Sequence, residues 1–116
     1  MMRYQVKRIY DAASDDDGYR VLIDRLWPRG MSKEQARIDL WLREIAPSDA
    51  LRKWYRHDHE KWEEFKARYF AELDNKTEQL EPLISHQDHE IVTLLFSSKE
   101  LKFNNARALK AYLEAI

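Results

Sequence analysis

The sequence predicts an α/β fold: a single compact three-layer domain with a mostly parallel central sheet flanked by helices. The length of 116 residues suits one hydrophobic core and is short for two. Strand-like and helix-like segments alternate along the chain, which is the pattern of parallel sheets with helical connections. No internal repeat, low-complexity tract or Pro/Ser-rich linker divides the sequence. We therefore expect residues 1–116 to form one domain.

The first part of the chain is expected to hold three strands and a short helix. Tyr4–Tyr10 has strand composition, and its adjacent lysine and arginine predict a peripheral position in the sheet. After an acidic loop, whose charge is most simply explained by solvation, Tyr19–Asp24 contains the apolar run of a central strand. Ser32–Gln35 matches a capping box and opens a helix that ends near Arg37. Asp39–Ile45 alternates between two faces, which favours a strand.

Helices dominate the next part. Ala46-Pro47-Ser48 ends the third strand, and Ser48 or Asp49 is expected to cap a helix that runs to about Arg56. Asp58 is expected to cap the following helix. An apolar stripe at spacings of three and four residues should pack that helix against the sheet; it consists of Trp62, Phe65, Tyr69 and Leu73.

The last part is expected to hold a helix break, a strand and a final helix. Proline lacks a backbone N–H, so Pro82 predicts a kink or a break between Asp74 and Pro82. Ile91–Phe96 is the clearest strand of the chain. Asn104 is expected to cap a helix whose apolar side chains face inward.

Composition excludes several classes of function. The chain has 20 basic and 21 acidic residues and a formal net charge of −1, so no global field favours a polyanion. The charge is uneven, because residues 1–37 carry a basic excess and residues 71–90 an acidic one. The absence of cysteine excludes disulfides, thiolate catalysis and thiolate zinc sites. With no apolar run of signal or membrane length, we expect a cytoplasmic protein that does not bind membranes.

The two glycines of the chain, Gly18 and Gly30, bracket the segment that we expect to carry the site. The strand Tyr19–Asp24 runs directly into charged and aromatic residues, and ligands of parallel α/β sheets collect at the carboxyl ends of strands. If this strand and Ile91–Phe96 are parallel neighbours, the loops that follow them meet. The polar side chains that these loops would contribute to an anion pocket are Arg25, Arg29, Lys33, Asn104 and Asn105.

Each of these groups has an expected role. Arg25 and Arg29 can each grip a carboxylate or phosphate through two parallel hydrogen bonds, and the asparagines can offer amide contacts next to a helix N-terminus. Asp24 is expected to orient the arginines or to act as a base, which makes it the candidate catalytic residue. The alternative is a structural ion pair between Asp24 and the arginines under Trp27. Trp27 is expected in the core, and the alternative is a stacking surface for a ligand ring.

Other motifs suggest less specific chemistry. Ser97 and Ser98 lie outside any Gly-x-Ser-x-Gly elbow, so a nucleophilic serine is disfavoured. The pairs His57/His59 and His86/His89 have metal-compatible spacing but no obvious third ligand, so neither a metal nor a cofactor is expected. Arg52–Arg56 mixes basic and aromatic residues as single-stranded nucleic-acid sites do, but the acidic residues that follow favour a solvated amphipathic helix.

The function that we expect is binding of a small anionic ligand, a phosphate-bearing or carboxylate metabolite or a nucleotide, with enzymatic activity left open. One alternative is a protein-interaction module that uses the acidic face between Glu72 and Glu90. A second alternative is weak nucleic-acid binding through Arg52–Arg56. The sequence does not indicate an oligomeric state.

The chain resembles a known family in five stretches. These are Asp17–Gly30, Ala46–Ser48 with Leu51-Arg52, Tyr69 with Glu72-Leu73, Thr93–Phe96 and Asn104–Ala106. Together they are similar to the YeaO-like group of small bacterial proteins in the family called domain of unknown function 488. The resemblance implies a compact α/β fold and a shared site, and it brings no established reaction. Family members usually have Asn-His-Ala at Asn104–Ala106 and more distant relatives have Cys-His-Arg nearby, so this chain lacks both the histidine and the cysteine.

Overall fold

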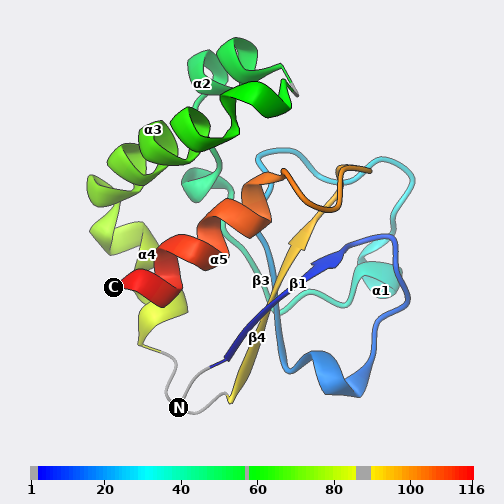
Figure 1. Ribbon diagram of the computed structural model, residues 1–116. Helices are drawn as coiled ribbons and strands as arrows, with labels where there is room; N and C mark the ends of the chain where they lie inside the picture. The colour runs from blue at the N-terminus through cyan, green and yellow to red at the C-terminus, as the bar shows by residue number, and fades with distance from the viewer. Residues whose placement is uncertain (1–2, 57, 86–89) are drawn as a thin grey trace.

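Parallel strands form the centre of the molecule. The computed structural model describes residues 3–56, 58–85 and 90–116, and within these ranges the sheet has four strands in the order β1-β4-β2-β3 (Figure 1). The strands are β1 (Arg3–Arg8), β2 (Tyr19–Leu22), β3 (Leu40–Trp41) and β4 (Ile91–Phe96). Every pairing is parallel, which confirms the predicted α/β class.

The position of each strand follows from its composition. β4 pairs along its whole length with β1, from Arg3 opposite Ile91 to Arg8 opposite Phe96. Its other edge pairs with β2. β1 is therefore an edge strand and β2 an interior one, as the charged and the apolar sequences predicted.

The third strand is much shorter than predicted. Only Leu40–Trp41 is a strand, and Arg43–Ile45 forms a turn of 3₁₀ helix. Strand alternation would place Leu42 and Ile45 on opposite faces, but both side chains are buried in the same core cluster. The chain turns after Leu42, because burying both apolar groups on one side requires helical rather than extended spacing.

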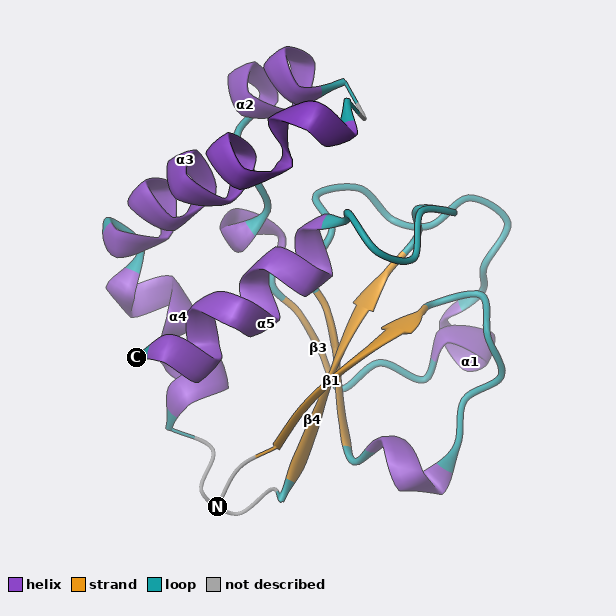
Figure 2. Cartoon of the chain, in the orientation of Figure 1, coloured by secondary structure: helices purple, strands orange, loops and turns teal. Residues whose placement is uncertain are grey.

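Four of the five α-helices among the described residues lie on the two faces of the sheet (Figure 2). On one side of the sheet lie α3 (Trp62–Asp74), α4 (Thr77–Ile84) and α5 (Asn105–Ala115), and α2 (Asp49–Tyr55) packs against α3 beyond the ends of the strands. The single turn of α1 (Lys33–Ala36) lies on the other face. No described helix combines the length and the apolar character needed to cross a membrane.

The helix boundaries follow the predicted caps. The side chains of Ser32, Ser48 and Asn104 each accept a hydrogen bond from a backbone N–H three residues later. Asp58 caps a 3₁₀ turn, His59–Lys61, that leads directly into α3. The predicted break lies at Asn75-Lys76, between α3 and α4, while Pro82 is accommodated inside α4.

Two core clusters lie on opposite faces of the sheet. The larger one fills the space between the sheet and helices α2 to α5, and it contains the predicted stripe residues Phe65, Tyr69 and Leu73. The smaller one lies beneath α1, where Trp27 packs edge-on against Trp41 at 5.4 Å between ring centroids. Trp27 also donates its indole N–H to the carbonyl of Met31 at 2.7 Å. Trp27 is thus half-buried and packs against the smaller core cluster, as the core prediction expected, but it is not fully enclosed.

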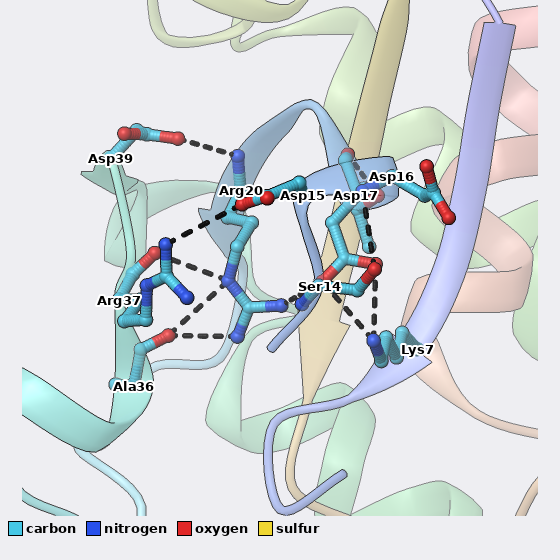
Figure 3. A network of polar contacts seen from close by, with 10 residues as sticks. Lys7, Ser14, Asp15, Asp16, Asp17, Arg20, Ala36, Arg37 and Asp39 are labelled. Carbon is cyan, nitrogen blue, oxygen red and sulfur yellow. Dashed lines mark hydrogen bonds and ion pairs between the residues drawn. The ribbon is translucent and has the colours of Figure 1, made fainter. Parts of the chain in front are cut away.

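One acidic residue of the first loop is buried. Solvation was the expected role of this loop, but Asp17 is only 4% exposed and forms ion pairs with Lys7 and Arg20 (Figure 3). Arg20 is also 4% exposed, and its guanidinium donates to the carbonyls of Ala36 and Arg37. This network joins β1, β2 and the end of α1, so Asp17 is a structural residue.

Candidate functional site

Two strand ends and a helix start meet at the Asp24 carboxylate. Its Oδ2 accepts hydrogen bonds from the backbone N–H of Ser97 at 2.8 Å and from the Ser97 hydroxyl at 2.7 Å. Its Oδ1 accepts one from the Asn105 side-chain amide at 3.0 Å. Asp24 follows β2, Ser97 follows β4 and Asn105 opens α5. The prediction that the two loops meet is confirmed, and Figure 1 shows them at the upper edge of the sheet.

The arginines do not pair with Asp24. Arg25 forms an ion pair with Asp49, the first residue of α2, and Asp49 also accepts a hydrogen bond from Arg52 at 2.7 Å. The expectation that Asp24 orients the arginines is therefore wrong, and so is the alternative of a structural ion pair among them. The Asp24 carboxylate instead receives three hydrogen bonds from Ser97 and Asn105, and the Arg25 guanidinium is held by Asp49.

The Arg25–Asp49 ion pair bridges α2 and the loop that follows β2. An open cleft of about 1040 Å³ lies between that loop and α2. The loop after β4 and the start of α5 complete its wall. The described residues that line the cleft are Tyr10, Asp24, Arg25, Leu26, Trp27, Pro28, Arg29, Ala46, Pro47, Arg52, Lys53, Tyr55, Phe65, Ser97, Ser98, Lys99, Glu100, Phe103, Asn104 and Asn105.

Positive charge dominates this lining. Its basic members are Arg25, Arg29, Arg52, Lys53 and Lys99, and its acidic members are Asp24 and Glu100. The charged groups of Arg29, Lys53 and Lys99 are exposed and have no ion pair or hydrogen bond within the described ranges. The cleft therefore offers unpaired cations to an anion, in a chain whose formal net charge is −1.

The other predicted site residues differ in their availability. Asn104 is 5% exposed, and its side chain accepts from the backbone of Arg107 at 2.9 Å and donates to the carbonyl of Glu100 at 2.8 Å. Its amide therefore serves the helix cap and the loop. Asn105 reaches the cleft next to Asp24. Lys33 is exposed on α1 and is not part of the cleft lining, because α1 covers the opposite face of the sheet (Figure 2).

Sequence reasoning missed the contribution of α2 to the cleft. The anion pocket predicted from the sequence includes neither Arg52 nor Lys53, which the sequence assigns to a helix and to the nucleic-acid alternative. The aromatic residues of that stretch do not form an open stacking surface, because Tyr55 is buried and the Trp54 ring has the Arg68 guanidinium 4.1 Å from its centroid. The amphipathic pattern of Arg52–Arg56 was the available signal, but only the fold brings this helix to the strand ends.

One histidine lies at the border of the cleft. The His59 Nε2 is 3.5 Å from a carboxylate oxygen of Glu100, and its ring lies 4.4 Å from that of Phe103. His57, His86 and His89 lie outside the described residues. Within residues 3–56, 58–85 and 90–116, no three or more His, Cys, Asp and Glu side chains are grouped as metal ligands.

Part of the acidic stretch from Glu72 onward has internal partners. The Glu72 carboxylate accepts hydrogen bonds from the backbone N–H of Ser48 at 2.9 Å and from its hydroxyl at 2.6 Å. Asp74 accepts one from the Tyr112 hydroxyl at 2.7 Å. These two acids hold helices together rather than presenting a free charged face.

Comparisons with known proteins agree with the resemblance found in the sequence. The family model described as "Inactive DUF488-N3 subclade" matches residues 3–116. The chain is 38% identical over 115 residues to Uncharacterized protein YeaO of Escherichia coli (strain K12), covering 99% of this chain and 100% of that protein. It is 36% identical over 111 residues to Uncharacterized protein Rv3073c of Mycobacterium tuberculosis (strain H37Rv), covering 96% of this chain and 93% of that protein. No solved structure matches this chain.

Proposed function

Because this chain belongs to the YeaO-like DUF488 family, within the subclade described as inactive, we propose that it binds a small anion in the cleft and does not transform it. The observation that carries the proposal is the gathering of five basic side chains against two acidic ones where β2, β4, α2 and α5 converge. Cations on the walls of a concave site concentrate anions there, whatever the net charge of the protein.

The cations divide into two groups with different roles. Arg29, Lys53 and Lys99 have unpaired charged groups, so they meet the anion without first breaking an internal contact. Arg25 and Arg52 both form ion pairs with the Asp49 carboxylate, so their guanidinium groups already have an acidic partner within the protein. An arriving anion competes with Asp49 for these two arginines.

Asp24 is a positioning residue in this proposal. Its carboxylate holds the end of β2 against Ser97 and the start of α5 and thereby fixes the walls that carry the cations. Binding without catalysis is supported by the same contacts, because the Ser97 hydroxyl donates a hydrogen bond to Asp24 rather than to a histidine that could activate it. The chain also has no cysteine. Asn105 stands where family members usually have a histidine.

The test is calorimetric titration of inorganic phosphate at low ionic strength, since salt screens exposed charges. Arg29→Ala should weaken binding at least about tenfold, because a charge-assisted hydrogen bond contributes about 1.5–3 kcal/mol. Lys33→Ala is the matched control: it removes one exposed cation outside the cleft and should leave the affinity unchanged. Asp49→Asn should strengthen binding, because it removes the internal competitor for Arg25 and Arg52.

The proposal fails if phosphate does not bind the wild-type protein. It also fails if Arg29→Ala and Lys33→Ala weaken binding equally, because a diffuse surface charge rather than the cleft would then hold the anion.

A further inference from the structure

The cleft has an apolar side as well as a cationic one. Its lining includes the aromatic residues Tyr55, Phe65 and Phe103 and the small apolar residues Ala46 and Pro47. These come from the segment before α2, from α2, from α3 and from the loop before α5. Ala46, Pro47, Tyr55 and Phe65 are buried, so the half-buried Phe103 is the part of this wall that a ligand can cover.

The aromatic part of the wall is held rigidly. The ring of Phe103 lies 4.4 Å from His59 and 5.4 Å from Trp62, and Tyr55 and Phe65 are tilted against each other at 4.5 Å between centroids. Rings fixed by their neighbours lose little conformational freedom when a ligand packs on them. The half-buried Phe103 is therefore a preformed apolar contact surface.

Leu26 extends this apolar character to the mouth of the cleft. Its side chain is 70% exposed, although it lies between Arg25 and Trp27 in the cleft wall. An apolar body in the cleft can cover this side chain and gains about 25 cal/mol for each Å² of apolar surface removed from water. Leu101 serves as a comparison, since it is 58% exposed in the neighbouring loop and does not line the cleft.

The size of the cleft also exceeds what a bare anion needs. Its volume of about 1040 Å³ is slightly above the roughly 300–1,000 Å³ of pockets that hold drug-sized organic ligands. Such pockets combine a mostly apolar lining with a few polar groups that set orientation. Here the unpaired cations Arg29, Lys53 and Lys99 supply the orienting groups.

We propose that the ligand of this cleft is an organic anion in which the acidic group is attached to an aromatic ring. The ring packs against Phe103 and Leu26, and the acidic group faces Arg29 and Lys99. This inference rests on the proposed function, because it places the anion at the same cations, and it adds the chemical class of the ligand.

The experiment compares inorganic phosphate, phenyl phosphate and phenol by calorimetric titration of the full chain. Phenyl phosphate should bind at least about tenfold more tightly than phosphate, because its ring buries apolar surface. Phenol should bind far more weakly than phenyl phosphate, because it lacks the group that the cations hold. The ratio of the phenyl phosphate and phosphate affinities then measures the contribution of the ring.

Two variants locate the ring. Leu26→Ser should lower that ratio about threefold or more, whereas the matched Leu101→Ser should leave it unchanged. Leu26 is mostly exposed, so its variant is expected to fold. Phe103→Ala should lower the ratio further, with circular dichroism used to confirm that α5 is intact.

The outcomes separate the two proposals. Equal affinities for phosphate and phenyl phosphate would overturn the aromatic ligand class and leave anion binding in place. A ratio that Leu26→Ser and Phe103→Ala both leave unchanged would also overturn it, because the ring would then lie elsewhere. Phenol binding as tightly as phenyl phosphate would overturn it as well, and failure of phosphate and phenyl phosphate to bind would overturn both proposals.

Discussion

Replacing Asp17 by asparagine removes the negative charge from a buried network and should lower the free energy of unfolding by about 3 kcal/mol at neutral pH. The side chains of Asp17 and Arg20 are 6% and 5% exposed. The carboxylate also accepts from Lys7 Nζ at 3.0 and 3.1 Å and from the Ser14 backbone at 3.0 Å (Figure 3). The variant leaves the Arg20 guanidinium buried without its counter-charge.

The magnitude follows from what Arg20 retains. Breaking a buried ion pair by removing one partner costs about 3–5 kcal/mol. Arg20 still donates to the carbonyls of Ala36 at 2.7 Å and Arg37 at 3.1 Å, and the new amide keeps an acceptor oxygen, so the low end applies. For a domain of this size the loss corresponds to a fall in Tm of roughly 10 °C.

The effect of this substitution depends on pH with a definite sign. Burial raises the pKa of Asp17, but the hydrogen bonds from Ser14, Lys7 and Arg20 outweigh it, so the pKa lies below its ordinary value. A carboxylate with a lowered pKa stabilises the folded state above its unfolded pKa of about 3.9 and loses that contribution as the pH falls through its folded pKa. The difference between wild type and variant should therefore shrink at about pH 3.

Urea denaturation followed by circular dichroism at pH 7 and at about pH 3 measures this difference. Asp15→Asn is the matched control in the same turn, because the Asp15 side chain is 99% exposed, and it should have no measurable effect. A loss below about 1 kcal/mol at neutral pH, or one that persists undiminished in acid, would refute the reasoning.

Two further substitutions test local conformations by the same denaturation assay. Gly18→Ala should lower the free energy of unfolding by more than about 1 kcal/mol, because φ is +64° and a Cβ would lie 2.4 Å from the carbonyl oxygen of Ile91. Gly30→Ala, at φ +77° with open space around it, should cost less, and an equal cost would contradict the role of the close contact. Asn104→Ala should cost at least about 1 kcal/mol, because it removes the cap of α5 and the hydrogen bond to the Glu100 carbonyl. Asn104→Ser also lacks the bond to Glu100 but keeps a cap oxygen, so it should cost less. Equal losses in these two variants would show that the cap oxygen does not stabilise the fold.

The sequence by itself determined the local features of the fold. The caps at Ser32, Ser48 and Asn104 were predictable because each connects groups only three residues apart. The interior place of β2 and the apolar stripe of α3 were predictable because periodicity reports which side of an element is buried. The early end of β3 was not predictable from periodicity, because Leu42 and Ile45 are both buried on one face although strand alternation places them on opposite faces.

Only the tertiary structure decided which groups form the candidate site. Asp24 meets Ser97 and Asn105 across 73 and 81 residues of sequence, and Arg25 pairs with Asp49 on a helix that no motif linked to it. Lys33 follows Arg29 closely in the chain yet lies over the opposite face of the sheet. The physical reason is that strand order and the faces on which helices pack set these distances, whereas residue spacing constrains only groups within one element.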